Sequence, residues 1–169
     1  MEPMIKFWKV LDKWGEFSNF YRREIVIDGR KWKSTEHYYQ AMKFYPDATI
    51  TLGTEPPSLE PYTITLHDYI AGLNRPREAA DEGRRRDFPM RPDWDDVKDD
   101  FMRRAIHAKF TQHADLREIL LSTGDDILIE DSPFDYYWGC GRDGSGKNML
   151  GVLLMELRDQ LRTTSVSFS

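Results

Sequence analysis

Cysteine is almost absent from this chain of 169 residues, because Cys140 is the only one. A single cysteine excludes an intramolecular disulfide and any metal site built from several thiolates. Such sparing use of cysteine is typical of proteins that stay in a reducing compartment. We therefore expect a cytoplasmic protein.

Long apolar runs are absent as well. No stretch approaches the roughly 18 uninterrupted apolar residues of a membrane-spanning helix, and the opening MEPMIKFWKV lacks the pattern of a secretion signal. We expect no membrane partner. Positive charge is also in deficit, with a net charge of −5 and an isoelectric point near 5.4, which argues against broad, salt-driven binding to duplex nucleic acid.

The common motifs of cofactor and metal sites are missing. Neither GxGxxG nor GxxxxGK[ST] occurs, and the four histidines, His37, His67, His107 and His113, show no metal-ligand spacing. We expect neither a metal nor a bound cofactor. No exposed apolar stripe is predicted, so we expect no obligate protein partner.

What the chain does contain is the material of one globular domain, at 40% hydrophobic and 13% aromatic residues. Asp28-Gly29 predicts a tight turn between two strands over 24–33. Apolar periodicity predicts helices, and residues 126–130 suggest a short strand. The predicted helices cover 36–45, 66–73, 76–85, 96–110, 114–122 and the segment after Asn148, which we expect to cap the last one.

These elements predict a predominantly helical α+β fold with a small β-hairpin or sheet. Residues 1–162 would form the domain, with a loop insertion at about 46–66, and residues 163–169 a flexible tail. The prolines and Gly53 within 46–61 make that stretch the least structured by composition.

The predicted helix at 36–45 carries Glu36, Gln40 and Lys43 on one face. If that face lines a pocket, a carboxylate and an amine converge on one ligand, where each shifts the pKa of the other. Such a pair suits acid–base or Schiff-base chemistry. The alternative is a polar face in solvent.

The segment from Ser132 to Gly151 concentrates five of the 11 glycines beside Asp135 and Trp138. Glycines let backbone approach a ligand, while an acid next to an indole suits a sugar or a base. The alternative is a turn-rich connector in which Asp135 caps a turn and Trp138 is a core residue. Arg84, in a run of three arginines, could likewise hold a phosphate or end a solvated helix.

Several segments, taken together and in order, resemble the NADAR family, also called YbiA-like. The similarity covers most of the chain and leaves out 46–67 and the tail. The stretches that carry it include WGEFSNF (14–20), STEHYYQAMKF (34–44), AADEGRRR (79–86), DYYWGCG (135–141) and GKNMLGVLLMELR (146–158).

The resemblance implies a compact, mainly helical domain that hydrolyses N-glycosidic bonds of ribosylated bases. The expected substrate is a small ribosylated base phosphate, such as a phosphorylated ribosylamino-pyrimidine intermediate of riboflavin biosynthesis. One alternative is removal of ADP-ribose from guanine in DNA or RNA. Another is a binding module for ADP-ribose or NAD without activity.

Carried over by motif, the expected catalytic residues are Glu36, Lys43 and Asp135. One of the two carboxylates would stabilise positive charge on the ribose, and the other would orient the sugar or activate water. Lys43 would be a charge partner or, as we favour, a nucleophile. The expected substrate-binding residues are Ser18, Asn19, Phe20, Arg84 for phosphate, Glu130, Trp138 for stacking on the base, Gly139 and Asn148.

Two features depart from the family pattern, namely Cys140 within WGCG and the long stretch 46–67. The second bears on substrate access and weakens any transfer of substrate identity.

Overall fold

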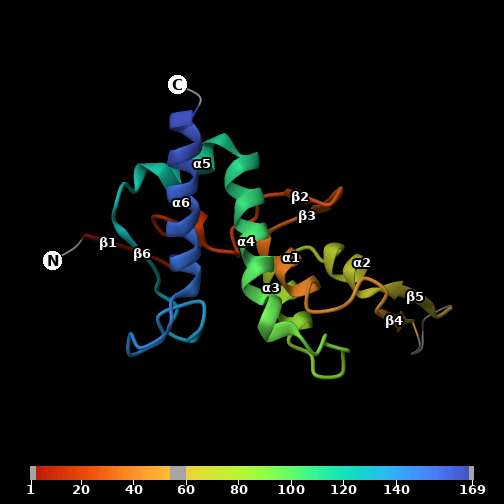
Figure 1. Ribbon diagram of the computed structural model, residues 1–169. Coiled ribbons are helices and arrows are strands. Elements are labelled where there is room, and N and C mark those ends of the chain that lie inside the picture. Colours follow the sequence, from red (N-terminus) through yellow and green to blue (C-terminus); the bar gives the residue numbers. More distant parts are fainter. Residues whose placement is uncertain (1–2, 54–59, 168–169) are drawn as a thin grey trace. The chain divides into compact units, whose positions relative to one another are not determined.

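The computed structural model describes residues 3–53 and 60–167. The chain divides into two compact units, one formed by Met1–Tyr21 with Ile106–Ser169 and the other by Arg22–Ala105 (Figure 1). Helices outweigh strands, and the described strands pair only two at a time. The predicted α+β class with a helical majority is therefore confirmed.

A parallel strand pair organises the unit formed by the two chain ends. β1 (Met4–Phe7) lies beside β6 (Ile127–Glu130), with Met4 opposite Ile127 and Phe7 opposite Glu130. The strand predicted at 126–130 is confirmed, but β1 was not predicted. Its four residues alternate between exposed and buried, which is too short a run for periodicity to distinguish a strand.

Helices cover this strand pair. α5 (Ala114–Ser122) and α6 (Met149–Ser167) pack against each other, and α6 also packs on β6. α6 continues to Ser167, past the last leucine of its apolar face. The flexibility expected for 163–169 stays a prediction. That apolar face is buried as its spacing predicts, at Leu150, Leu153, Leu154, Leu157 and Leu161. The same unit holds the short 3-10 helix η1 (Gly15–Phe17).

The second unit begins with the predicted hairpin. β2 (Ile25–Ile27) and β3 (Arg30–Trp32) are antiparallel, and Asp28 and Gly29 connect them at φ 52° and 76°. Aspartate and glycine tolerate this left-handed conformation, which matches the twist of two short strands. The hairpin prediction is therefore confirmed.

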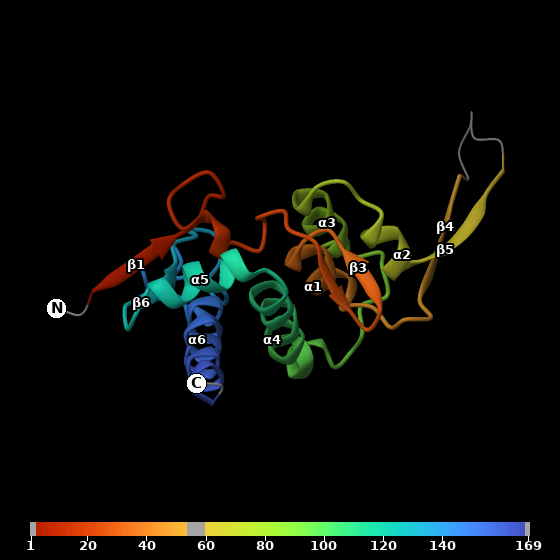
Figure 2. The same cartoon turned by 90° about the horizontal axis from the view of Figure 1, so that it is seen from above.

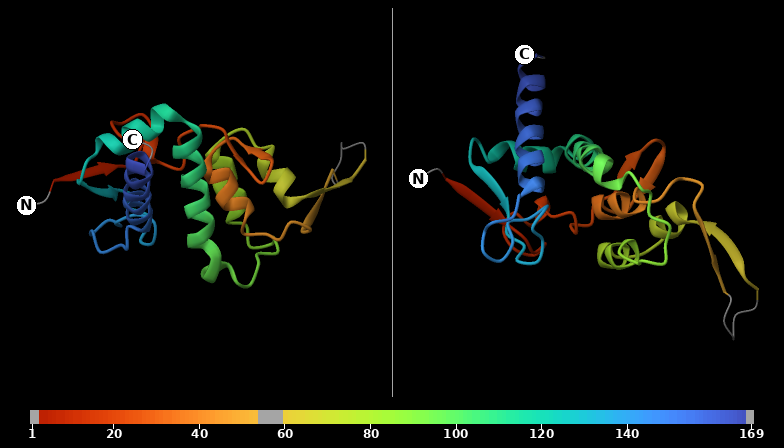
Figure 3. Two further views of the ribbon diagram at one scale, coloured as in Figure 1. Left: turned by 45° about the horizontal axis from the view of Figure 1, so that its top comes forward. Right: turned by 60° about the horizontal axis from the view of Figure 1, so that its bottom comes forward.

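Four helices follow in this unit: α1 (Thr35–Ala41), α2 (Leu66–Ala71), α3 (Pro76–Gly83) and the larger part of α4 (Trp94–Gln112). α1 contacts both α2 and α3 (Figure 3). It ends earlier than predicted, because the backbone tightens into turns at Lys43 and Phe44. Pro46 follows closely, and the residue before a proline disfavours helical backbone.

The stretch from 46 to 61, expected as a loop, contains a strand. β4 (Thr49–Leu52) pairs antiparallel with β5 (Tyr62–Thr65), and the two extend beyond α2 (Figure 2). The loop expected at about 46–66 was wrong at 49–52 and at 62–65, which are strands. Around the first of them, flanking prolines and Gly53 masked alternating β-branched residues. Residues 54–59 of the expected loop lie outside the described residues.

Within the described part of the chain, no helix combines the length and the apolar character that crossing a membrane requires.

Candidate functional site

Helix α1 is buried on every side, its polar residues included. Glu36 is 8% exposed and Gln40 only 3%. The alternative of a solvated polar face is therefore wrong. A carboxylate and an amide that are taken out of water require partners, so the polar stripe of this helix is a buried network.

The start of α1 is held by a histidine. The Ser34 hydroxyl accepts a hydrogen bond from the His37 amide at 3.2 Å and lies 2.7 Å from His37 Nδ1. His37 Nε2 lies 3.0 Å from the Leu73 carbonyl oxygen. Because a carbonyl only accepts, Nε2 carries the proton and Nδ1 accepts from Ser34. Burial lowers the pKa of His37 from its usual value and favours this neutral form.

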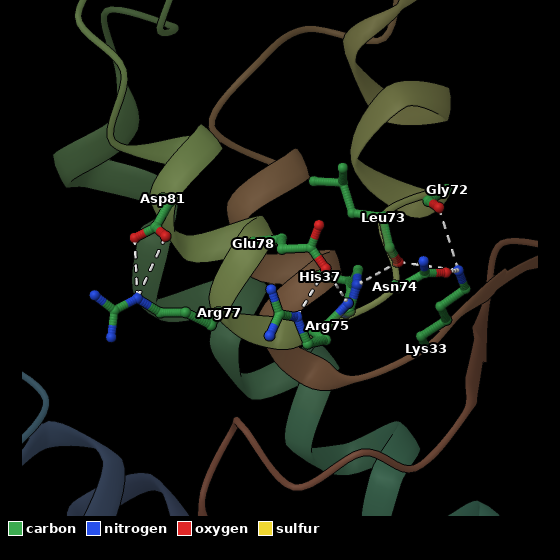
Figure 4. A network of polar contacts seen from close by, with 9 residues as sticks. All are labelled: Lys33, His37, Gly72, Leu73, Asn74, Arg75, Arg77, Glu78 and Asp81. Carbon is green, nitrogen blue, oxygen red and sulfur yellow. Dashed lines mark hydrogen bonds and ion pairs between the residues drawn. The ribbon is translucent and has the colours of Figure 1, made fainter.

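Lys33 forms a second set of hydrogen bonds to the connection between α2 and α3 (Figure 4). Lys33 Nζ donates to the carbonyl oxygens of Gly72 at 3.2 Å and Leu73 at 2.9 Å. The next turn is closed by Glu78, whose carboxylate accepts from the Arg75 amide at 3.1 Å. The first turn of α1 is thereby fixed to the segment that leads into α3.

Two predicted catalytic residues, Glu36 and Lys43, lie in α1 and just after its end. Gln40 Nε2 donates to Glu36 Oε1 at 2.6 Å. Lys43 lies just past the helix end and donates from Nζ to the Gly83 carbonyl oxygen at 3.3 Å. Gly83 is the last residue of α3. The carboxylate and the amine are therefore both supported by groups at the contact between α1 and α3.

The Lys43 amine has a perturbed proton affinity. Burial is the main influence and lowers the pKa of Lys43, the charge of Glu36 opposes this, and the positive charges of Arg84 and Lys98 lower it further. Arg84 itself is exposed and follows directly after α3. Glu36, Lys43 and Arg84 thus belong to one electrostatically coupled group in the unit Arg22–Ala105.

In the other unit, Asp135 closes a turn. Its Oδ1 accepts from the backbone amides of Tyr137 at 2.9 Å and Trp138 at 2.7 Å. This is the turn role that the sequence left open as an alternative. Trp138 is half-buried, and its ring meets the Tyr137 ring edge-on at 4.9 Å. One oxygen of Asp135 is therefore engaged by its own backbone.

Asn148 corrects a prediction. It stands directly before α6 at φ 52°, but its side chain turns to β6 rather than capping the helix. The amide oxygen accepts from the Glu130 amide at 2.8 Å, and Nδ2 donates to the Leu128 carbonyl at 2.9 Å. Since β1 is the one strand that pairs with β6 among the described residues, a side-chain amide that donates and accepts satisfies backbone groups on the other edge of β6.

Two glycines of the segment 132–151, Gly139 and Gly146, allow backbone to pack on backbone where this segment leads into the start of α6 (Figures 1 and 3). A methyl group at Gly139 would lie 3.1 Å from the Glu130 carbonyl oxygen, and one at Gly146 would lie 2.4 Å from the Gly139 carbonyl oxygen. Glu130 is half-buried at the end of β6, and its backbone carbonyl oxygen accepts a hydrogen bond from the Cys140 amide at 2.9 Å. Close packing thus accounts for these glycines.

Neither Asp143 nor Cys140 was predicted to be functional. Hydrogen bonds from Ser145 lower the pKa of Asp143, which closes a turn. Burial and the nearby Asp131 carboxylate raise the pKa of the Cys140 thiol, which disfavours a reactive thiolate. Among residues 3–53 and 60–167, no group of three or more His, Cys, Asp or Glu side chains is placed to hold a metal ion.

The predicted SNF residues form a turn before Tyr21. Ser18 and Asn19 are buried and Phe20 is 40% exposed. The Ser18 hydroxyl accepts a hydrogen bond from the Phe20 amide at 3.1 Å. The backbone carbonyl of Ser18 accepts one from Lys109 Nζ at 3.0 Å. Lys109 is only 1% exposed, and the sequence analysis gave it no role.

The predicted site residues therefore fall into two groups. Glu36, Lys43 and Arg84 lie in the unit Arg22–Ala105. The remaining predicted residues lie in the unit of the chain ends, namely Ser18, Asn19, Phe20, Glu130, Asp135, Trp138, Gly139 and Asn148.

Comparison with known proteins gives consistent matches along the chain. The N-glycosidase YbiA of Escherichia coli (strain K12) is 42% identical over 160 residues, which cover 95% of this chain and 89% of that protein. An N-glycosidase of Nostoc punctiforme is 42% identical over 158 residues, covering 94% and 92%. The riboflavin biosynthesis protein PYRR of Zea mays is 40% identical over 170 residues, which make up 26% of that longer protein.

A solved structure shares the fold. The NMR structure of E. coli YbiA matches with a TM-score of 0.80 at 40% sequence identity, covering 98% of this chain and 89% of that one. The family model of the NADAR domain matches residues 6–162. The resemblance read from the motifs is thereby confirmed, and the chain belongs to the NADAR domain family.

Proposed function

We propose that this protein is an N-glycosidase that hydrolyses the C1–N bond between a ribose and a base or amine. The proposed substrates are phosphorylated ribosylamino-pyrimidine intermediates of riboflavin biosynthesis. The names of relatives support this proposal, since two are N-glycosidases and a third is a riboflavin biosynthesis protein. The single cysteine favours a reducing location, for which we propose the cytoplasm.

The observation that carries the proposal is the buried Glu36 carboxylate, whose charge acts on the half-buried Lys43 amine. A buried carboxylate and an amine of lowered pKa are more typical of a reaction site than of a structural ion pair at a surface. Each is held by a specific hydrogen bond. A fixed negative charge and a neutral amine together suit chemistry at a sugar carbon that develops positive charge.

Glu36 would act on the charge that develops in the transition state. As the C1–N bond breaks, positive charge appears on the ribose ring, and a nearby carboxylate stabilises it. A fixed carboxylate at low dielectric is more effective than one in water. We propose Glu36 for this role, and Asp135 remains the candidate for orienting the ribose or activating water.

Lys43 would act as the nucleophile. In its neutral form, Nζ adds to C1, the bond from C1 to the base nitrogen breaks, and that nitrogen leaves with a proton. Water then hydrolyses the bond between C1 and Nζ, which releases the sugar and restores the amine. Burial and two cationic neighbours, which lower the pKa of Lys43, favour the neutral amine that this step needs.

Substrate binding would use the remaining predicted residues. Arg84 is exposed and carries a guanidinium that suits a phosphate. Trp138 is half-buried and offers an indole face for a base. We propose these roles for Arg84 and Trp138, with the SNF turn, Glu130, Gly139 and Asn148 as further binding residues.

A paired turnover assay tests the proposal. The purified protein receives a ribosylamino-pyrimidine phosphate in one reaction and guanine-ADP-ribosylated DNA in another, with Glu36→Gln as the inactive control. We expect release of the sugar phosphate in the first. Release of ADP-ribose in the second alone would assign the protein to reversal of nucleic-acid modification. Binding of ADP-ribose without turnover of either substrate would contradict an enzymatic role.

A further inference from the structure

We propose that Gln40 and Gly83 together form a support that positions both reacting groups, Glu36 through the Gln40 side chain and Lys43 through the Gly83 carbonyl. The inference deepens the proposed function and rests on it for the roles of Glu36 and Lys43. Gln40 and Gly83 are positioning residues in this account, because neither needs to touch the substrate.

The Gln40 amide has only one workable orientation. Its Nε2 donates to Glu36 Oε1 at 2.6 Å. A reversed amide would turn an oxygen towards the carboxylate, where two acceptors repel each other. Gln40 is 3% exposed, so the side chain cannot swing into water. Glu36 is therefore held by a fixed, buried donor one helical turn away.

The other end of the same amide rests on Gly83. Gln40 Oε1 is buried and accepts no hydrogen bond from any residue in the described part of the chain. A methyl group at Gly83 would come within 2.0 Å of Oε1 and 2.7 Å of the amide carbon. The oxygen thus packs against the glycine backbone, where weak Cα–H···O contacts are favourable. A side chain at position 83 would push the amide away.

Helix formation does not explain this glycine. Gly83 has ordinary helical backbone at the end of α3, where alanine is the better helix former by about 1 kcal/mol. An alanine at position 83 would not fit, because its methyl group would collide with the Gln40 amide. The Gly83 carbonyl also accepts from Lys43 Nζ at 3.3 Å, so one residue supports Gln40 on one side and the catalytic amine on the other.

Loss of the support has a defined consequence. Hydrogen bonds to a carboxylate favour its ionised form, and their removal makes the carboxylate easier to protonate. Lys43 is the cation coupled to Glu36, and Arg84 and Lys98 are the further positive charges acting on Lys43. None of these three is altered by a change at Gln40. A shift in the titration of Glu36 would therefore report the lost amide donor.

Two substitutions test the support, one at each of its residues. Gln40→Leu removes the donor at similar volume, while Gly83→Ala displaces the amide without touching it chemically. We expect each to lower kcat by about 10–100-fold, the order of effect of a misplaced catalytic group, with KM changed by only a few-fold. On the acid side of the kcat/KM profile, where Glu36 must be ionised and Lys43 neutral, the lower of the two apparent pKa values would move to higher pH in both variants.

Matched controls are available in the same chain. Gly72→Ala adds a methyl group 3.4 Å from the Asp68 carbonyl, an ordinary contact, and Gln160→Leu changes an exposed glutamine. Both should leave kcat and the pH profile unchanged. Thermal unfolding identifies any variant that fails to fold, and Gln40→Leu decides the question if Gly83→Ala does not fold. Wild-type kcat and an unmoved acid limb in Gln40→Leu would overturn the inference.

A readout without turnover separates this inference from the proposed function. The carboxyl carbon of Glu36 can be titrated by NMR in the wild type and in Gln40→Leu. We expect the midpoint to move to higher pH in the variant, whether or not the protein cleaves the ribosylamino-pyrimidine. An unchanged midpoint would overturn the positional role of Gln40, while a shifted midpoint in a protein without turnover would contradict the proposed function alone.

Discussion

Helix α1 and the segment 132–151 contain similar residue types and use them in opposite ways. In α1, Glu36 and Gln40 are buried and hydrogen-bonded to each other, and Gln40 packs against Gly83 at the end of α3. In 132–151, Asp135 and Asp143 accept hydrogen bonds from residues two or three positions on. The acid of the helix is buried and accepts from a side chain one helical turn away, whereas the acids of the segment accept from backbone amides of their own turns.

The difference shows where polar groups are costly. A turn aspartate accepts from backbone amides close to it in the chain and need not be fully buried to do so, so it stabilises the fold. A buried glutamate and lysine oppose folding unless each is fully paired, and chains retain them where they are useful. We infer that the reacting carboxylate and amine belong to α1 and its C-terminal end, while the segment chiefly shapes backbone and contributes Asp135 as a further catalytic candidate.

The largest expected effect is loss of catalysis in Glu36→Gln. Glutamine keeps an oxygen that can accept from Gln40 Nε2 but has no charge, so we expect kcat to fall by about 10²–10³-fold with little change in thermal unfolding. Glu118→Gln, on the exposed surface of α5, serves as the matched control and should retain full activity. Equal activity in Glu36→Gln and Glu118→Gln would contradict a catalytic role for the carboxylate of α1.

The next effect is on stability and belongs to the segment 132–151. Gly146→Ala places a methyl group 2.4 Å from the Gly139 carbonyl oxygen, and backbone cannot yield as a side chain can. We expect a loss of about 1–3 kcal/mol in the free energy of unfolding, measured by urea denaturation. A variant as stable as Gly72→Ala would show that these glycines do not serve close packing.

A smaller effect separates the two possible roles of Asp135. Removal of a capping side chain costs about 0.5–2 kcal/mol, so we expect Asp135→Ala to lose stability in this range. Asparagine keeps the accepting oxygen, and Asp135→Asn should unfold like the wild type. The turnover of Asp135→Asn then tests the predicted catalytic charge alone, and we expect it to be lost. Full activity would leave Asp135 with its turn role only.

The smallest effect concerns the acid stability of α1. The pKa of His37 is lowered in the folded state by burial, so the unfolded chain binds more protons between that value and about 6.5. This contribution to stability is complete above about pH 6.5 and is lost as the pH falls through the folded pKa. His67, whose pKa burial also lowers, adds to the same trend.

Urea denaturation at several pH values measures this slope. We expect a shallower loss of stability on acidification in His37→Leu than in the wild type, although the variant is less stable at neutral pH because Ser34 and Leu73 lose their partner. His107→Leu, at an exposed position, should keep the wild-type slope. An identical slope in all three proteins would contradict the neutral, buried state of His37.

Local patterns predicted much of this fold. The left-handed turn at Asp28-Gly29 and the leucine face of α6 follow from residues that are neighbours in the chain. β1 could not be predicted, because a four-residue strand is defined by its distant partner β6. The strand at 49–52 was hidden by flanking turn residues for a similar reason.

The candidate site divides along the same line. The spacing of Glu36, Gln40 and Lys43 placed them on one face, but their burial depends on α3, about 40 residues further along the chain. Gly83 and Lys109 were missed because each acts through a contact with remote backbone or side chain. Asn148 was placed correctly before α6, yet its partners lie on β6, which helix-capping rules do not include.

The pH dependence of single-turnover cleavage in the wild type and in Lys43→Arg tests the central claim most directly. If Glu36 and Lys43 carry the chemistry, the wild-type rate rises with pH through an apparent pKa below the usual lysine value of about 10.4, since burial lowers the pKa of Lys43. Arginine keeps the charge but cannot supply a neutral amine, so Lys43→Arg should fall to background while it unfolds like the wild type. A wild-type rate in Lys43→Arg would contradict the account.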